Sequence, residues 1–428
     1  MNNWIQTTVG EQATLQRGFD ITRAAQRPGP VPVISSGGTS SFHDEAAAKG
    51  PGVVLGRKGV VGSVFFVETD YWPHDTTLWV RDFHGNDPRF VYYFFRSFAS
   101  ELARLDVGSA NPTLNRNHVH PVSIVWPSSV VEQQAISALL GSLDDKIELN
   151  RRMNETLETM AQAIFRDWFV DFGPVRRKME GAIDPVVIMG GVVPDPARVA
   201  ELTGLFPGTF TGDLPDRWSS STLGDHFRLE RGLSYKGAFL HEDGLPMINL
   251  GCFLGGGSFS YGRMKGYKGE HKMRHLLKSG TLILANTDMT QNRIILGSPH
   301  IVQEGLCGEE VLFSHHVYAA RPRFESSSAW ARFFYFHLLQ PEFRARAEGF
   351  ATGTTVLALP KDAVEGLEFP VPSEELNAAF LSLVEPLLDR VTANELENRT
   401  LAETRDYLLP RLMSGEVSVR DVYSAVSE

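Results

Sequence analysis

Trp4-Ile-Gln-Thr-Thr-Val-Gly10 and Trp218-Ser-Ser-Ser-Thr-Leu-Gly224 are two stretches of this chain with the same pattern of residues. The second lies 214 positions after the first, and the same spacing relates further identical residues. These pairs are Leu15 and Leu229, Arg17-Gly18 and Arg231-Gly232, Pro32 and Pro246, Ile34 and Ile248, and Gly37 and Gly251. Because solenoid units match over only about 20 to 50 residues, this long match predicts two copies of one architecture in a single polypeptide.

Two later segments carry a second repeat, whose pattern is that of long amphipathic helices. Apolar residues recur in alternating steps of four and three, a spacing that keeps one stripe of a helix against a partner. The first stripe consists of Ile136, Leu140, Leu143, Ile147, Asn150, Asn154, Leu157, Ala161, Ile164 and Trp168. The second lies 244 positions later and consists of Phe380, Val384, Leu387, Val391, Asn394, Asn398, Leu401, Arg405, Leu408 and Leu412. The repeating unit is therefore a globular domain followed by a long helix.

The two stripes are expected to pack against each other as an antiparallel coiled coil, because two related halves in a closed arrangement favour a pseudo-twofold axis. A polar residue in such a stripe weakens packing but penalises misaligned pairings, so Asn150, Asn154, Asn394 and Asn398 are expected to set the register. The alternative is that each helix lies on its own globular domain. We also expect two prolines to interrupt the second helix, with a kink or restart at Pro386 and an end at Pro410.

The globular segments have the composition of mixed α/β (α+β) domains. Their strand-like runs are bounded by Gly, Pro, Asn or Asp, and include 53–55, 64–67, 78–80, 281–284 and 317–319. Aromatic-rich helices are expected near 88–105 and 329–348. We divide the chain into a first globular domain (1–127), a long helix (128–170), a proline-rich linker (171–217), a second globular domain (218–372), and a second long helix with a tail (373–428).

Charge and cysteine content narrow the class of protein. The formal net charge is −10, but the first and second globular segments carry 0 and +1, while the two helical stretches carry −5 and −6. Neutral domains can still have a basic face, so the overall charge does not exclude DNA binding. Two cysteines, Cys252 and Cys307, offer neither a disulfide framework nor metal-ligand spacing. With no leader and no apolar run of ~18 residues, we expect a soluble cytoplasmic protein that does not enter a membrane.

Several stretches resemble the specificity subunits of type I restriction–modification systems. The central conserved region of that family is similar to Glu132–Ile136, Phe165–Phe172 and Pro174–Lys178, and its distal conserved region is similar to Tyr407–Gly415. The resemblance extends over essentially the whole chain. Two further stretches, Gly56–Gly59 with Val61-Gly62 and Tyr71–Thr77, resemble looser motifs of the family's target-recognition domains.

The resemblance implies a non-catalytic subunit that binds a bipartite double-stranded DNA target. Each globular domain would recognise one half of that target, and the helical pair would set the distance between the halves. Two copies of an adenine methyltransferase subunit would dock on the conserved helices, and restriction subunits with translocase activity would join for cleavage. No cofactor is implied for this subunit. The competing hypothesis is a coiled-coil scaffold whose globular domains bind protein.

Candidate DNA-binding residues of the first domain occur on three glycine- or hydroxyl-rich stretches. A basic pair flanked by glycines lets the backbone approach DNA while its side chains reach phosphate or a guanine edge. The candidates are Arg57 and Lys58; His74, Thr76 and Thr77; and Ser109, Asn111 and Thr113. The basic pair could instead be a solvated β-turn, and the neighbouring Asp75 could orient a donor or cap a turn.

Candidates of the second domain are hydroxyl, amide and basic residues on loops. Asn and Gln can bind adenine in a bidentate manner, and small hydroxyl residues suit phosphate. The candidates are Ser234, Tyr235 and Lys236; Asn286, Thr287, Thr290, Gln291 and Arg293; and Thr354 and Thr355. Any of these could instead be a hydrogen-bonded strand end or an ordinary turn.

Motifs for chemistry are missing from the sequence. It contains no Asn/Asp-Pro-Pro-Tyr/Phe motif, no Walker A motif and no clustered His and Cys for a metal, so we expect neither catalysis nor a metal site. His315 and His316 form a conspicuous pair, but neighbours on a strand point to opposite faces. We therefore expect this pair to be structural.

Overall fold

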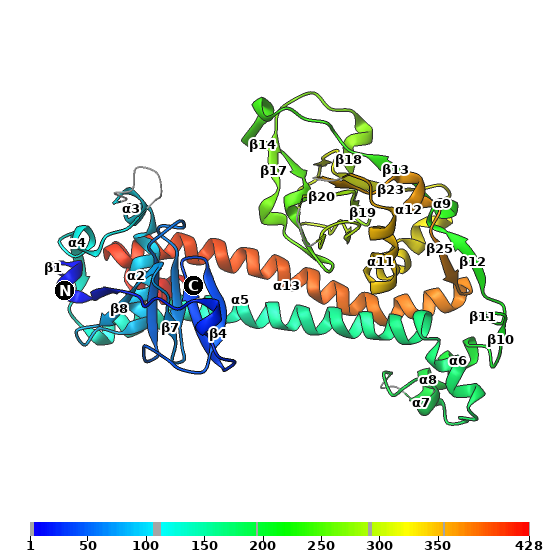
Figure 1. The fold of residues 1–428 in the computed structure, drawn as a ribbon, viewed down its shortest axis with the longest axis horizontal. Coiled ribbons are helices and arrows are strands. Elements are labelled where there is room, and N and C mark those ends of the chain that lie inside the picture. The colour runs from blue at the N-terminus through cyan, green and yellow to red at the C-terminus, as the bar shows by residue number, and fades with distance from the viewer. Residues whose placement is uncertain (1–3, 106–112, 194–195, 290–292, 354–355, 428) are drawn as a thin grey trace. The chain divides into compact units, whose positions relative to one another are not determined.

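The computed structural model describes residues 4–105, 113–193, 196–289, 293–353 and 356–427 (Figure 1). The chain forms two compact units. The first comprises residues 1–149 and 397–428, and the second comprises residues 150–396. Each unit therefore combines one globular domain with part of both long helices.

The first globular domain is built on a four-stranded antiparallel sheet. Its strand order is β2 (Thr14–Arg17), β8 (Thr77–Asp82), β5 (Gly52–Gly56) and β6 (Val64–Val67). A second sheet has the order β4 (Gly38–His43), β3 (Val31–Ser35) and β7 (Trp72–Pro73), and β1 (Trp4–Thr8) pairs with β9 (Ser123–Pro127). The helices are α1 (Val9–Gln12), α2 (Pro88–Ser97), α3 (Ala99–Arg104) and α4 (Arg116–Val119). The aromatic helix expected near 88–105 is therefore present as α2 and α3.

The second globular domain repeats this plan. Its main sheet has the order β13 (Phe227–Arg231), β23 (Val317–Pro322), β19 (Leu282–Ala285) and β21 (Pro299–Ile301). The second sheet has the order β17 (Lys265–Tyr267), β14 (Leu240–Ile248), β22 (Val311–Phe313) and β18 (Leu276–Leu277). Shorter pairs are β12 (Ser219–Thr222) with β25 (Glu368–Val371), β15 (Phe253–Gly255) with β16 (Ser258–Phe259), and β20 (Thr287–Asp288) with β24 (Leu357–Ala358). The helices are α9 (Leu223–His226), α10 (Ala331–Leu339), α11 (Pro341–Phe350) and α12 (Lys361–Glu365).

Strand registers confirm the internal repeat and show where the two copies differ in length. Positions that hold the same place in the sheets are Ile34 and Ile248, 214 apart; Gly56 and Ala285, 229 apart; and Thr77 and Val317, 240 apart. The second domain therefore has one insertion between β14 and β19 and another between β19 and β23. The glycine-rich stretch Gly255–Gly257 lies in the first of these insertions.

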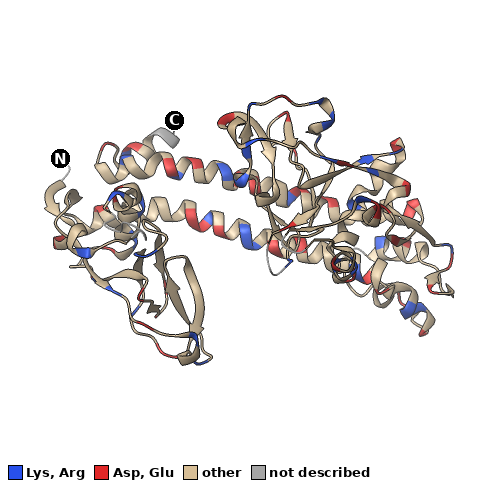
Figure 2. Cartoon of the chain, turned by 45° about the horizontal axis from the view of Figure 1, so that its top comes forward, with Lys and Arg blue, Asp and Glu red and all other residues tan. Residues whose placement is uncertain are grey.

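The long helices α5 (Val130–Phe165) and α13 (Glu374–Ser414) run antiparallel within each unit. In the first unit, Asp144 pairs with Arg405 and Lys146 with Glu397. In the second unit, Asn154 contacts Asn394, and the Phe165 ring lies 5.5 Å from the Phe380 ring. Residues further along α5 contact residues nearer the start of α13, so the predicted antiparallel pairing is confirmed. Both helices carry acidic and basic residues along their length (Figure 2).

One asparagine pair of the predicted stripes forms a buried hydrogen bond. Asn394 Nδ2 donates to Asn154 Oδ1 at 2.7 Å, and both side chains are buried. Asn150 is also buried, whereas Asn398 is only half-buried. The Asn154–Asn394 contact is what a register-setting pair requires, because sliding the helices would leave both amides without a partner.

The expected interruptions at Pro386 and Pro410 are wrong, since α13 continues through both residues to Ser414. Each proline removes one N–H from the helix and leaves a carbonyl without its usual donor. Both prolines are exposed on the helix surface. Water can therefore hydrate the freed carbonyls, and the apolar stripe on the opposite face keeps the helix in place.

The segment 171–217 is more ordered than a linker. It contains α6 (Gly173–Met179), α7 (Pro185–Ile188), α8 (Pro196–Leu205), β10 (Phe210–Thr211) and β11 (Leu214–Pro215). Its side chains Val175, Met189, Leu202 and Phe206 are buried in the cluster that also contains Trp168. Prolines at the first turns of these helices are compatible with helix starts, so the proline content indicated breaks without revealing the packed elements between them.

Glu158 on α5 leads to a stability prediction. Burial, with the nearby charges of Glu395 and Glu155, raises the pKa of Glu158 to about 7 from an ordinary value of 4.5. Between these two pH values the folded protein keeps a proton that the unfolded chain has released, so this carboxyl lowers stability as pH rises. We expect Glu158→Gln to stabilise the protein at pH 8 by about 1 kcal/mol more than at pH 5.

Urea unfolding at the two pH values measures this difference. Glu155→Gln is the matched control, because Glu155 is exposed one turn away on the same helix and its replacement should have a smaller effect. If Glu158→Gln raised the free energy of unfolding by the same amount at both pH values, the prediction would be contradicted.

Candidate nucleic-acid interface

The candidate residues of the first domain meet at one edge of the main sheet. Arg57 and Lys58 directly follow β5, and the turn His74–Thr77 leads into the neighbouring strand β8. The backbone N–H groups of Arg57 and Lys58 donate to the carbonyl of Thr76 at 2.9 and 3.1 Å. The sheet therefore places two separate sequence motifs side by side.

Asp75 is the centre of charge in this cluster. Its carboxylate lies 2.8 Å from Arg17 Nη2, 3.9 Å from Lys58 Nζ and 3.2 Å from His74 Nδ1. Burial acts to raise the pKa of Asp75, but the hydrogen bond from Arg17 and the neighbouring positive charges outweigh it and lower the pKa. The carboxylate is therefore ionised at neutral pH. Arg17 and Lys58 are exposed by 55% and 46%, so both can reach phosphate without leaving a buried site.

The remaining candidates of the first domain have different positions. Thr113 forms a β-bridge with Lys58, which brings it to the same sheet edge. Thr77 is fully buried and donates its hydroxyl to the His74 carbonyl at 2.7 Å, so its assignment as a DNA contact is corrected to a structural role. Ser109 and Asn111 lie outside the described residues.

The second domain has the same backbone arrangement at the same place. Asn286 N–H donates to His316 O at 2.9 Å, as Arg57 N–H does to Thr76 O. Leu359 N–H donates to Asn286 O at 2.8 Å, as Leu114 N–H does to Arg57 O at 2.9 Å. The turn 314–317 is thus the counterpart of the turn 74–77, and Asn286 is the counterpart of Arg57.

Burial corrects the roles of Asn286 and Thr287. Their exposed fractions are 1% and 3%, so neither side chain can contact DNA directly. Asn286 Nδ2 donates to His315 O at 3.1 Å, and the Thr287 hydroxyl lies 2.8 Å from His316 Nδ1. These two side chains therefore position the turn that carries His315 and His316.

The structure also overturns the expected placement of His315 and His316. They occupy the turn between β22 and β23, not a strand, and their ring centroids are only 3.9 Å apart. The Tyr235 ring lies 6.1 Å from His315, and Arg231 Nε donates to His315 O at 2.8 Å. Sequence reasoning missed this pair because its match to Asp75 and Thr76 becomes visible only once the strand registers are known.

Exposed polar residues border this turn in the second domain. Ser234 and Lys236 are exposed on either side of Tyr235, and Lys265 Nζ lies 5.9 Å from the Tyr235 ring centroid. Arg293 is exposed as well. Thr290, Gln291, Thr354 and Thr355 lie outside the described residues.

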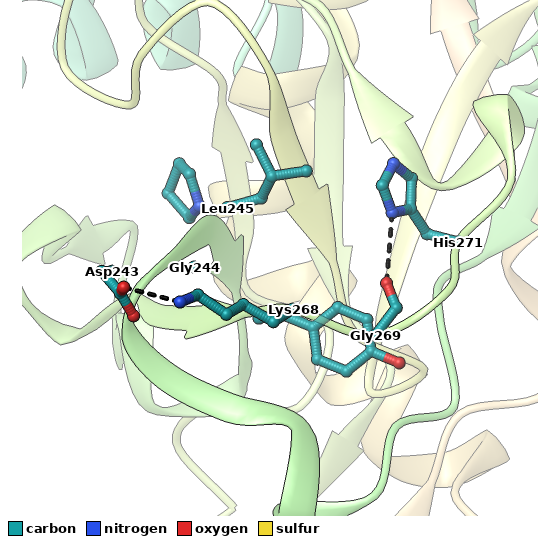
Figure 3. A pocket seen from close by; sticks show the side chains of 8 residues that line it. Asp243, Gly244, Leu245, Lys268, Gly269 and His271 are labelled. Carbon is teal, nitrogen blue, oxygen red and sulfur yellow. Dashed lines mark hydrogen bonds and ion pairs between the residues drawn. The ribbon is translucent and has the colours of Figure 1, made fainter.

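Figure 3 shows a shallow pocket of this domain. One of its lining residues is Tyr267, whose ring lies 6.4 Å from that of Tyr235. The pocket has a volume of about 360 Å³ and is lined by Asp243, Gly244, Leu245, Pro246, Tyr267, Lys268, Gly269 and His271. Lys268 and Asp243 form an ion pair of 2.6 Å on its wall. Its surrounding segment 261–278 contains six Lys and Arg and one Glu, which makes this side of the domain basic.

One group of side chains in the described residues has the geometry of a metal site. Ligand atoms of Asp20, His74 and Asp75 all lie within 4.8 Å of one another. Asp75 already pairs with Arg17 and Lys58, whose positive charges disfavour a bound cation. We assign no metal to this group.

Comparison with known proteins places this geometry in a family. Residues 1–159 match the type I restriction modification DNA specificity domain. The type I restriction enzyme HindI specificity subunit of Haemophilus influenzae is 26% identical over 333 residues, covering 72% of this chain and 71% of that protein. The MjaIX specificity subunit of Methanocaldococcus jannaschii is 23% identical over 337 residues, covering 78% of this chain and 70% of that protein. Residues 1–159 thus match the DNA specificity domain of type I restriction–modification systems, and the chain is similar to specificity subunits over most of its length.

A solved structure shows that the fold is shared. The S subunit of a type I restriction–modification system from M. genitalium has a TM-score of 0.56 to this chain at 17% identity, covering 96% of both chains. The two relatives named above are both specificity subunits of type I restriction enzymes. Among the described helices, none combines the length and apolar character needed to cross a membrane.

Proposed function

We propose that this chain is a non-catalytic specificity subunit that binds a bipartite double-stranded DNA target, with one half recognised by each globular domain. One observation carries the proposal. The two domains hold different side chains on the same backbone arrangement, with Arg57, Asp75 and Thr76 in one and Asn286, His315 and His316 in the other. A shared scaffold with different side chains is what two separately specified half-sites require.

The antiparallel helices are proposed to act as a spacer and as a docking surface. Continuous helices resist bending, so they suit a fixed distance between two half-sites. Their acidic stretches are poorly suited to phosphate but compatible with protein partners. We propose that methyltransferase subunits, two per complex, dock there and that restriction subunits join through the complex.

Methylation sequencing of a host that carries the intact system tests the bipartite target. The expected result is a methylated motif with two defined halves separated by a fixed number of unspecified bases. A motif with a single continuous recognition sequence would overturn the proposal.

Arg57 and Lys58 are expected to contribute to the first half-site. Arg57→Ala with Lys58→Ala should weaken DNA binding about 10- to 100-fold and reduce the salt dependence of binding by about one or two phosphate contacts. Gel-shift titration of the subunit with its methyltransferase partner, at low and moderate salt, measures both quantities.

Arg81→Ala provides the control for charge, since Arg81 is exposed near the opposite end of β8. It should leave affinity within about twofold. Equal losses for the double variant and for Arg81→Ala would show that the basic pair acts only through overall charge.

A further inference from the structure

We propose that His315 and His316 recognise bases in the second half-site, at the position that Asp75 and Thr76 hold in the first domain. The inference rests on the proposed bipartite function and assigns a specific recognition element to it. It reverses the structural role that the sequence indicated for this histidine pair.

The turn that carries the two histidines has the same position in its domain as the turn His74–Thr77 has in the first. The turn is held in both domains by the same bonds: His74 N–H donates to Ile34 O and Ser314 N–H to Ile248 O, each at 2.9 Å. The next strand starts in the same way, because Thr77 N–H donates to His74 O and Val317 N–H to Ser314 O, each at 2.9 Å. The backbone is thus constant, whereas the side chains of the turn differ, including the two central ones.

The two imidazoles are held in place and are still accessible. Both residues are half-buried. Thr287, itself buried, contacts His316 Nδ1, and the carbonyl of His315 receives Asn286 Nδ2 and Arg231 Nε. Side chains fixed in this way lose little conformational entropy when a ligand binds.

Buried polar atoms without a hydrogen-bond partner are concentrated around this turn. Within the described residues, Asn286 Oδ1, Ser314 Oγ and His315 Nδ1 are buried and have no hydrogen-bond partner. Buried polar atoms are nearly always paired in folded proteins, and exceptions cluster at functional sites. Three such atoms in and beside one turn indicate a site that is completed by bridging water, since Asn286 itself is too buried to contact DNA.

The chemistry favours bases over phosphate. Burial, with the proximity of His315 and Arg231, lowers the pKa of His316, which favours its neutral imidazole. A neutral imidazole offers one donor and one acceptor, a combination that suits a base edge and gains little from an anionic phosphate. The basic residues Arg231, Lys236 and Lys265 around the turn are suited to phosphate instead.

Methylation sequencing of the intact system with His315→Ala and His316→Ala together tests the proposal. We expect at least one base position of one half-site to lose its preference about tenfold or more, with the other half-site unchanged. Thr76→Ala should relax the other half-site only. His241→Ala, which replaces an exposed histidine of the same domain, should change neither.

Thermal unfolding of each purified complex separates a loss of recognition from a loss of folding. If the double variant unfolds at a lower temperature, His316→Gln, which keeps a hydrogen-bonding group near Thr287, replaces it in the same experiment. A folded histidine variant with both half-sites unchanged would overturn the inference while leaving the bipartite function intact. A wild-type complex without a bipartite motif would instead overturn the proposed function.

Discussion

Replacing Asp144 by alanine is expected to lower the free energy of unfolding by about 3 to 4 kcal/mol. Asp144 lies on α5 and accepts hydrogen bonds from Tyr93 Oη at 2.7 Å, Arg405 Nη1 at 2.7 Å and Arg96 Nη1 at 3.1 Å. Arg405 occupies a position in the apolar stripe of α13 and is only 12% exposed. Without the carboxylate, its charge would remain largely buried beside a single partner, Asp406.

The pKa of Asp144 reflects the same hydrogen bonds and charges. Burial acts to raise it, but the hydrogen bonds from Tyr93 and Arg405 and the charges of Arg96 and Arg405 outweigh burial and lower it. Because the folded-state pKa is below the ordinary value, the stabilisation is present above about pH 4 and is lost as pH falls through the folded-state pKa. Wild type and Asp144→Ala should therefore differ less in acid than at pH 7.

The neighbouring Asp145 provides the matched control. Its side chain is 63% exposed and pairs with Arg89 at the helix surface. Asp145→Ala should cost less than about 1 kcal/mol, as exposed ion pairs do. Urea unfolding followed by circular dichroism compares the two variants, and equal losses would show that the Asp144 network adds nothing to an ordinary surface ion pair.

Replacing Asn394 alone by leucine is expected to cost about 2 kcal/mol of unfolding free energy. The substitution leaves Asn154 Oδ1 buried without the amide that donates to it at 2.7 Å. The double change Asn154→Leu with Asn394→Leu should recover most of this loss, because an apolar pair replaces a polar one. A double-mutant cycle should thus give a coupling of about 1 to 2 kcal/mol.

The recovered stability should come with looser register. In the double variant, sliding of α5 past α13 no longer leaves amides unpaired, so hydrogen exchange along the helices should become faster even though the unfolding free energy is restored. A register-setting role for this pair would be contradicted if the stability losses of the two single variants simply added. Unchanged hydrogen exchange in the double variant would contradict it as well.

The general plan of the chain could be predicted from local patterns. Repeats at fixed spacing and stripes of apolar residues every three or four positions depend only on neighbouring residues, and they predicted both domains, both helices and the antiparallel pairing. The same reasoning failed at Pro386 and Pro410, since the helix rule takes no account of an exposed face and of packing on the opposite face.

Candidate recognition residues were harder to predict because they meet only through strand pairing. Arg57 and Lys58 were found as a motif, but their contact with the turn His74–Thr77 depends on β5 lying beside β8. Asn286 had suitable chemistry for DNA, yet it is buried. Residue type alone could not separate a side chain that contacts a ligand from one that holds the contacting turn.

The sequence by itself determined that one architecture is used twice, that each copy ends in a long helix, and that the chain resembles a DNA-specificity subunit. These features are periodic or contiguous, so they survive without knowledge of the fold. Only the tertiary structure decided that Asp75–Thr76 and His315–His316 occupy equivalent turns in the two domains. Segments of different length separate these residues from the start of their domains, so sequence spacing alone does not match them. Hydrogen bonds between strands place them at equivalent positions in the two sheets.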